Sequence, residues 1–111
     1  MEKETKEPSV YLMREEGRKF VEEMESVLKE NDYKGGWKNS NDSFLEKKLI
    51  EEFAEYFLSL NHPAWTPLNV IREFINQVNY AIGHVDKTEN GTKKELVDIA
   101  NICMMLHDNL P

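Results

Sequence analysis

Apolar residues recur every three or four positions in four stretches of the chain, as they do along one face of an α-helix. The first stretch contains Val10, Phe20 and Val27, and polar or glycine-containing segments separate the stretches from one another. The pattern predicts an all-α, four-helix domain over residues 9–111, preceded by a disordered polar tail over residues 1–8. The predicted helices span residues 9–31, 42–61, 67–85 and 92–109.

Polar residues at N-terminal positions set the starts of the predicted helices. Ser9 is placed to cap the first helix, and Thr66 followed by Pro67 is placed to cap the third. Thr92 is predicted to cap the fourth helix, with Glu95 three residues later completing a capping box. For the second helix any of three neighbouring residues would serve: Ser40, Asn41 or Asp42.

The apolar surfaces of the last two helices are broader than a single small bundle easily covers. The fourth helix is apolar nearly all round between Leu96 and Leu106, which predicts burial on several sides. Asp98 lies in the middle of that helix and needs a partner, which a lysine, an asparagine or a metal ion would supply. The third helix has its own broad stripe from Val70 to Val85. We therefore predict an oligomer, either a homodimer or a homotetramer built from dimers.

Length, charge and cysteine content narrow the class of protein. A chain of 111 residues corresponds to one domain, and a net charge of −7 argues against a nucleic acid polymer as the partner. No apolar run is long enough to span a membrane, and the start of the sequence is charged, so we expect a cytoplasmic protein. The single cysteine, Cys103, lies in an apolar run and is expected to be a buried thiol.

Two pairs of acidic residues stand at helical spacing on two of the predicted helices. Glu52 and Glu55 are three residues apart on the second helix, and Glu95 and Asp98 are three apart on the fourth. Residues at this spacing are neighbours on a helix surface. If the two helices face each other, the four carboxylates converge, and they would repel strongly without cations between them. Oxygen ligands of this kind suit Mg²⁺, which commonly takes further ligands from the phosphates of a nucleotide.

The sequence Glu51-Glu52-x-x-Glu55, followed by Glu95-x-x-Asp98, resembles the two-part motif of the MazG-like, all-α nucleoside triphosphate pyrophosphohydrolases. The run from Glu95 to Met105 and the loop 35–37, Gly-Gly-Trp, are similar to small members of that family. The resemblance covers roughly residues 35–60 and 92–109. It implies an enzyme that hydrolyses a nucleoside or deoxynucleoside triphosphate to a monophosphate and pyrophosphate, with Mg²⁺ as the cofactor and Mn²⁺ as a substitute.

The same resemblance implies roles for the acidic residues. The implied Mg²⁺ ligands are Glu52, Glu55, Glu95 and Asp98. Glu51 and Glu52 are the implied catalytic residues, with Glu51 activating water, although Glu51 could instead bind a further ion or be an ordinary exposed residue. The alternative for the whole set is that Glu52 and Glu55 lie at the rim of the core, Glu95 is a cap and Asp98 is paired with a lysine.

Four further residues are candidates for binding the nucleotide. Lys48 and Lys94 each stand four residues before an implied metal ligand and are candidates for contacting phosphate, or else are surface lysines. Asn101 is implied to contact the sugar or base, and its alternative role is to orient Asp98. Trp37 would stack on a base or cover the core.

Two other functions are compatible with the sequence. The same fold and metal site could act on phosphoribosyl-ATP, as a related family does. A non-catalytic helical module that binds a nucleotide or a protein would need no metal chemistry, and release of pyrophosphate distinguishes it from an enzyme.

Overall fold

The protein is described by a computed structural model, which places residues 13–30, 37 and 41–111. These residues form four α-helices and one short 3-10 helix, with no strand among them, so the prediction of an all-α fold is confirmed. The elements are α1 (Glu15–Glu30), α2 (Asp42–Ser59), η3 (Pro63–Trp65), α3 (Pro67–Ala81) and α4 (Glu89–Asn109). The predicted disordered tail over residues 1–8 lies outside the described residues.

The chain divides into two compact units, each of which is described by itself. One unit contains α1 and α4, and the other contains α2, η3 and α3. The prediction of a single domain over residues 9–111 stays a prediction. None of the helices in the described part of the chain is both long and apolar enough to cross a bilayer.

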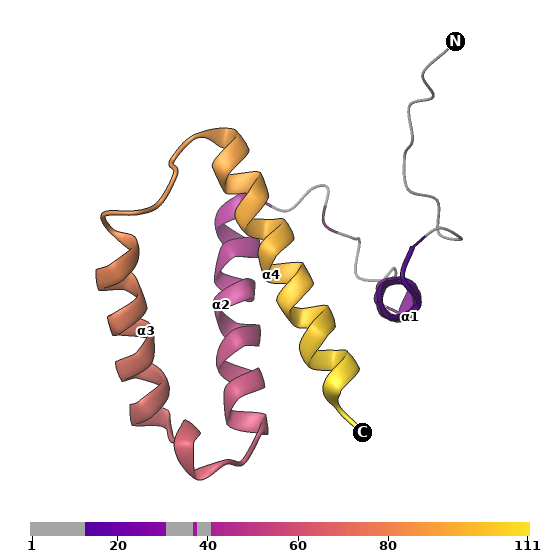
Figure 1. Ribbon diagram of the computed structural model, residues 1–111, viewed down its shortest axis with the longest axis horizontal. Helices are drawn as coiled ribbons and strands as arrows, with labels where there is room; N and C mark the ends of the chain where they lie inside the picture. Colours follow the sequence, from indigo (N-terminus) through magenta and orange to yellow (C-terminus); the bar gives the residue numbers. More distant parts are fainter. Residues whose placement is uncertain (1–12, 31–36, 38–40) are drawn as a thin grey trace. The chain divides into compact units, whose positions relative to one another are not determined.

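In the second unit, α2 and α3 form an antiparallel hairpin that turns at η3 (Figure 1). Helix α2 ends because Asn61 adopts a left-handed conformation, with φ of 47°, which asparagine tolerates better than most residues. The next residue, His62, accepts a hydrogen bond at Nδ1 from the Ala64 backbone N–H at 3.0 Å and so caps η3. The reversal is therefore built from local contacts between neighbouring residues.

Both helices of this hairpin begin at side-chain caps that the sequence predicts. Asn41 Oδ1 accepts from the Phe44 N–H at 2.8 Å, which selects Asn41 among the three candidates for the cap of α2. Thr66 Oγ1 accepts from the Asn69 N–H at 3.2 Å, and Pro67 occupies the first turn of α3. The Asn69 side chain also donates to the Ala64 carbonyl at 3.1 Å, which ties the start of α3 to η3.

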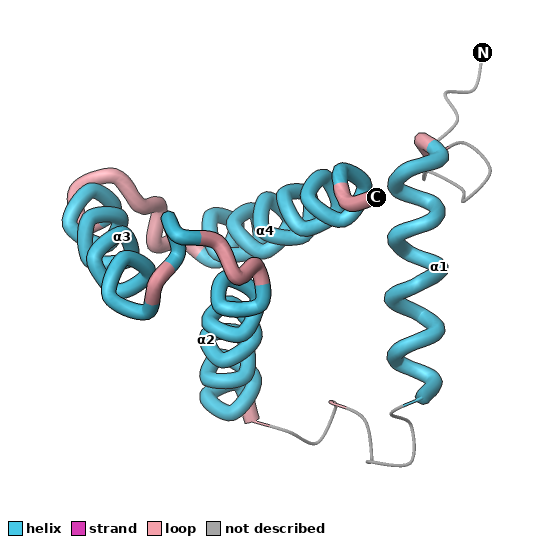
Figure 2. The backbone as a smooth tube through the Cα atoms, turned by 90° about the horizontal axis from the view of Figure 1, so that it is seen from below, coloured by secondary structure: helices cyan, strands magenta, loops and turns pink. Residues whose placement is uncertain are grey.

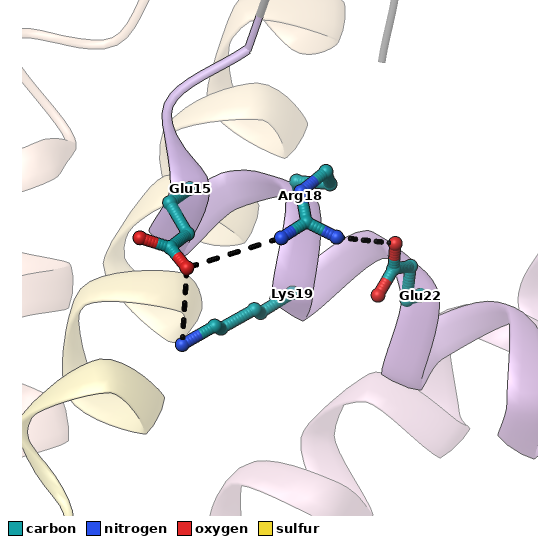
Figure 3. Close-up of polar contacts among 4 residues, drawn as sticks. All are labelled: Glu15, Arg18, Lys19 and Glu22. Carbon is teal, nitrogen blue, oxygen red and sulfur yellow. Dashed lines mark hydrogen bonds and ion pairs between the residues drawn. The ribbon is translucent and has the colours of Figure 1, made fainter. Parts of the chain in front are cut away.

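In the first unit, the C-terminal part of α4 approaches the side of α1 (Figure 2). The contact is aromatic and polar: the Phe20 and His107 rings meet edge to face at 5.4 Å between centroids, and His107 Nε2 lies 3.8 Å from Glu23 Oε2. The exposed side of α1 carries ion pairs one turn apart, with Arg18 between Glu15 and Glu22 (Figure 3). Lys19 adds a second cation beside Glu15 at 3.5 Å. Such exposed pairs each support a helix by about 0.3–0.5 kcal/mol.

The largest differences from the predicted helix ends are at the starts of α1 and α4 and at the end of α3. Helix α1 does not extend back to Ser9, because Met13 and Arg14 are not helical and the helix starts at Glu15. Helix α3 stops at Ala81 and not at Val85, and a turn through Gly83 follows it.

The fourth helix starts at Glu89, so the predicted capping box of Thr92 and Glu95 does not form and both residues lie inside α4. The physical reason lies upstream, where Asp86 Oδ1 accepts from the Thr88 N–H at 2.9 Å. That bond forms a tight turn directly before the helix and lowers the pKa of Asp86 below its usual value. The helix then continues through Gly91 without interruption.

The apolar residues predicted to form a core are largely exposed in the single chain. Among the described residues, no hydrophobic side chain is buried. Phe74 is 62% exposed on α3, and Val97 is 58% exposed on α4, which was predicted to be buried on several sides. Cys103, predicted as a buried thiol, is half-buried. Each of the two units therefore presents apolar surface that its own described helices leave uncovered.

Candidate functional site

Helix α2 brings three of the candidate acidic residues together in its middle turns. Glu51, Glu52 and Glu55 are all exposed, and one cation accompanies them: Lys48 Nζ donates to Glu51 Oε2 at 3.1 Å. Lys48 stands four residues before Glu52, and the structure pairs it with Glu51, three residues later. One lysine therefore stands among three carboxylates on this part of the helix.

The negative charge of the cluster affects the pKa of Glu55. Its pKa is raised above the usual value, chiefly by the charge of Glu52, then by partial desolvation and by the charge of and a hydrogen bond with Glu51. Lys48 lowers the pKa of Glu55, but by less than these effects raise it. The same carboxylates raise the pKa of Lys48, with the hydrogen bond to Glu51 as the largest cause. The α2 cluster, defined as Glu51, Glu52 and Glu55, thus carries negative charge that its own lysine does not balance.

Helix α4 carries the second acidic pair, in which one member has a close cation. Lys94 Nζ donates to Asp98 Oδ2 at 2.8 Å, and the side chains are 72% and 43% exposed. This hydrogen bond, followed by the charge of Asp98 and then that of Glu95, raises the pKa of Lys94. Among the partners that the sequence left open for Asp98, the structure therefore provides a lysine. In the α4 pair, Glu95 is exposed and Asp98 is half-buried, and both belong to a continuous helix.

The remaining candidates lie on or near these helices. Asn101 is on α4, one turn beyond Asp98, at an exposed position. Trp37 precedes α2 in the chain and is 52% exposed. The two glycines of the loop 35–37 lie outside the described residues.

The candidate site residues thus fall into two sets, one in each unit. The α2 cluster with Lys48 belongs to the unit of α2 and α3, and the α4 pair with Lys94 and Asn101 belongs to the unit of α1 and α4. Within either unit, the described residues contain no group of three or more histidine, cysteine, aspartate or glutamate side chains arranged to hold a metal ion. Each set supplies carboxylate oxygens, which are the ligands that Mg²⁺ prefers, and a lysine ammonium group beside them.

Comparisons with family models, with curated proteins and with solved structures find no match to this chain.

The structure also contains an apolar groove that the sequence did not predict. It has a volume of about 460 Å³ and lies between α2 and α3, with Trp65 of η3 at one end. Its apolar lining includes Ile50, Phe53 and Phe57 of α2, together with four residues of the stripe predicted for the third helix: Val70, Ile71, Phe74 and Ile75. The breadth of the third helix's stripe was the available signal, but a stripe does not say whether its own chain covers it.

Proposed function

We propose that this protein is a Mg²⁺-dependent, MazG-like nucleotide pyrophosphohydrolase, which cleaves a nucleoside or deoxynucleoside triphosphate to a monophosphate and pyrophosphate. The observation that carries the proposal is the charge imbalance on α2, where mutual repulsion raises the pKa of Glu55. Neighbouring carboxylates that repel one another favour the binding of a divalent cation, because the cation offsets their repulsion. The two-part motif supplies the second pair, Glu95 and Asp98, on another helix.

The donor set fits a hard cation. Every implied ligand, Glu52, Glu55, Glu95 and Asp98, offers carboxylate oxygens, and all four side chains are accessible. When bound, Mg²⁺ supplies neutralisation of the triphosphate charge and polarisation at phosphorus. In this proposal Glu52, Glu55, Glu95 and Asp98 are the residues that would hold the metal, and Lys94 would exchange its bond to Asp98 for one to a phosphate oxygen.

The remaining residues orient the nucleotide and the attacking water. A carboxylate oxygen of Glu51 or Glu52 accepts a proton from water as the water oxygen bonds to the α-phosphorus. The bond between the α-phosphorus and its bridging oxygen to the β-phosphorus breaks, so pyrophosphate leaves with that oxygen. Lys48 neutralises phosphate charge, Asn101 contacts the sugar or base, and Trp37 stacks on the base.

Analysis of the products tests the proposal directly. The purified full chain would be incubated with each common nucleoside and deoxynucleoside triphosphate, and with phosphoribosyl-ATP, in Mg²⁺ or Mn²⁺. Chromatography should show a monophosphate and pyrophosphate in equal amounts. Accumulation of a diphosphate and phosphate would contradict the proposed bond cleavage. Hydrolysis of phosphoribosyl-ATP alone would assign the substrate to the related family.

A non-catalytic binding module is the second candidate. The observation that favours it is the 2.8 Å bond between Lys94 and Asp98, which balances one implied ligand without any metal. A module would bind nucleotide or protein without releasing pyrophosphate from any triphosphate of the panel. Nucleotide binding without turnover, in the presence of Mg²⁺ and Mn²⁺, would select this candidate.

A further inference from the structure

His62 satisfies both backbone donors of the turn between α2 and α3. Its carbonyl oxygen accepts from the Trp65 N–H at 2.9 Å, and its ring Nδ1 accepts from the Ala64 N–H at 3.0 Å. Pro63, the remaining residue of η3, has no N–H to satisfy. The turn also holds the Trp65 ring against that of Phe57, with 4.9 Å between their centroids. One histidine therefore closes the turn that joins the two helices.

The ring hydrogen bond fixes the protonation state of His62. A backbone N–H can only donate, so Nδ1 must present its lone pair to Ala64 and the ring proton must be on Nε2. A protonated imidazole carries a hydrogen on both nitrogens, so its Nδ1–H would face the Ala64 N–H with no acceptor between them. Protonation of His62 is therefore incompatible with this bond and releases the Ala64 N–H to water.

The other two of the chain's three histidines have partners that tolerate a charged ring. His84 Nδ1 lies 2.7 Å from the Tyr80 carbonyl oxygen, which can only accept, so the ring donates in either protonation state. His107 Nε2 lies 3.8 Å from Glu23 Oε2, which is an attractive partner for a protonated ring. In the described structure, His62 is therefore the histidine whose hydrogen bond is broken by acid.

The chain around the turn supplies no counter-ion for a charged ring. Residues 56–71 contain no aspartate, glutamate, lysine or arginine, and the next charged side chains along the chain are Glu55 on α2 and Arg72 and Glu73 on α3. Among the described residues, the backbone bond is the one polar contact of the His62 ring. The end of α2 attracts a cation and the start of α3 repels one, so the two helix dipoles act in opposite directions.

We propose that His62 is a pH-sensitive cap, which holds the turn between α2 and α3 while its ring is neutral and releases the turn when its ring is protonated. A histidine in an unfolded chain takes up its proton at about pH 6.5, and the capped turn does not accept that proton. The free energy of unfolding therefore rises with pH through this range, and the contribution of the cap is lost as the pH falls. The inference uses contacts inside the turn and does not depend on the proposed enzymatic function.

Thermal unfolding of the full chain at pH 8 and at pH 5.5 tests the proposal. The matched variant is His62→Asn, because asparagine keeps a side-chain acceptor at the cap position and does not titrate. Acidification should lower the melting temperature of the wild type by about 3–5 °C more than that of the variant, because only the wild type loses its cap. An equal response to pH in the two proteins would overturn the proposal.

Two further variants separate the cap from other roles of the histidines. His62→Ala removes the acceptor at every pH, so it should melt about 3–5 °C below the wild type at pH 8 and close to the wild type at pH 5.5. His84→Asn should keep the wild-type response to pH, because the bond at His84 is compatible with a protonated ring. If His62→Ala were equally destabilising at both pH values, His62 would support the turn without sensing pH, and the proposal would be wrong.

Nitrogen-15 NMR of the wild-type protein gives a readout that needs no well-folded variant. At pH 8 the Nδ1 resonance of His62 should be that of an unprotonated ring nitrogen, because this atom accepts the bond. The Ala64 amide signal should shift as the His62 ring titrates, because the amide loses its acceptor. A proton on Nδ1 at pH 8, or an Ala64 signal that does not follow the titration of the ring, would contradict the assignment of the cap.

Discussion

The acidic residues of α2 and those of α4 differ in how their charge is balanced. On α2, three carboxylates share one lysine, and repulsion from Glu52 raises the pKa of Glu55. On α4, Lys94 lies 2.8 Å from Asp98, so the two carboxylates of the α4 pair share one lysine. Two motif halves that look equivalent in the sequence are therefore electrostatically unequal in the folded chain.

This difference distinguishes the two sets of carboxylates. The α2 cluster gains a missing positive charge when a divalent ion binds, whereas the α4 pair must replace the lysine that it already has. A divalent ion would relieve repulsion on α2, so its binding there is favoured by the charge already present. An ion that binds the α4 pair would displace or share Lys94, so its binding there competes with an existing bond. In the proposed enzyme the free lysine then becomes a partner for a phosphate oxygen, which couples binding of the metal to binding of the nucleotide.

The largest expected effect is on turnover. Glu55→Gln and Asp98→Asn should each lower the rate of pyrophosphate release at least about 100-fold, because each removes a charge that would hold the metal at the reacting phosphate. Glu46→Gln, at an exposed position on α2 outside the cluster, is the control and should keep the wild-type rate. If Glu55→Gln lost activity and Asp98→Asn kept it, the site would be restricted to α2, and the α4 pair would have no part in it.

Stabilisation by Mg²⁺ is the next largest effect. A ligand that binds only the native state contributes about 2.7 kcal/mol at 100 times its dissociation constant, which raises the melting temperature of a domain of this size by roughly 10 °C. Thermal unfolding monitored by circular dichroism, with and without Mg²⁺, should show this shift in the wild type. The shift should disappear in both Glu55→Gln and Asp98→Asn, and an unchanged shift in Asp98→Asn would exclude α4 from the site.

Without metal, the two substitutions should have opposite signs. Glu55→Gln removes repulsion and should raise the melting temperature by about 1–2 °C at pH 7, whereas Asp98→Asn loses an attractive partner and should lower it by a similar amount. High salt should shrink both changes, because the side chains are exposed. If both substitutions changed the melting temperature of chelator-treated protein in the same direction, charge balance would not distinguish the two helices.

The raised pKa of Glu55 also predicts a pH dependence with a definite sign. Between its usual value of 4.5 and its raised value in the folded chain, the native state binds more protons than the unfolded state. The free energy of unfolding therefore falls as the pH rises through this window, and the fall is complete above the raised pKa. Denaturant titrations of the wild type and Glu55→Gln across weakly acidic pH should show a smaller fall in the variant.

The smallest effect concerns the lysine of α4. Lys94→Met removes the cation that competes for Asp98, so the dissociation constant for Mg²⁺ alone should fall about two- to fivefold in a calorimetric titration. If Lys94 also contacts phosphate, the KM for the nucleotide should rise in the same variant. Lys48→Met is the parallel change on α2, where the lysine pairs with Glu51 and not with an implied ligand. Weaker Mg²⁺ binding in Lys94→Met would contradict the competition.

Much of the fold could be predicted from local sequence. Four helices follow from the spacing of apolar residues, and Asn41 and Thr66 cap α2 and α3 because their side-chain oxygens reach the backbone N–H groups of the first turn. The start of α4 could not be predicted by the same rule. Thr92 with Glu95 matches the capping pattern, yet a turn at Asp86 precedes a helix that starts at Glu89, and the local pattern did not indicate this earlier start.

The candidate site was predictable only in part. The i,i+3 spacing places Glu52 beside Glu55 and Glu95 beside Asp98, because a helix fixes those neighbours. The partners of the charges were less predictable, since Lys48 stood at suitable spacing for either of two glutamates and the structure selects Glu51. The groove was missed because apolar positions at Ile50 and Phe74 identify a face but do not identify what covers it.

The short reversal between α2 and α3 has a consequence for the speed of folding. The helices it joins are neighbours in sequence, so the hairpin closes through contacts of low sequence separation, which form in microseconds to milliseconds. If the groove is covered by a second chain, that covering is a bimolecular event. Refolding should then show a fast phase that is independent of concentration, followed by a slower phase whose initial rate constant doubles when the chain concentration doubles. Dilution would lengthen the time that Phe74 spends exposed to water, and with it the interval in which chains aggregate.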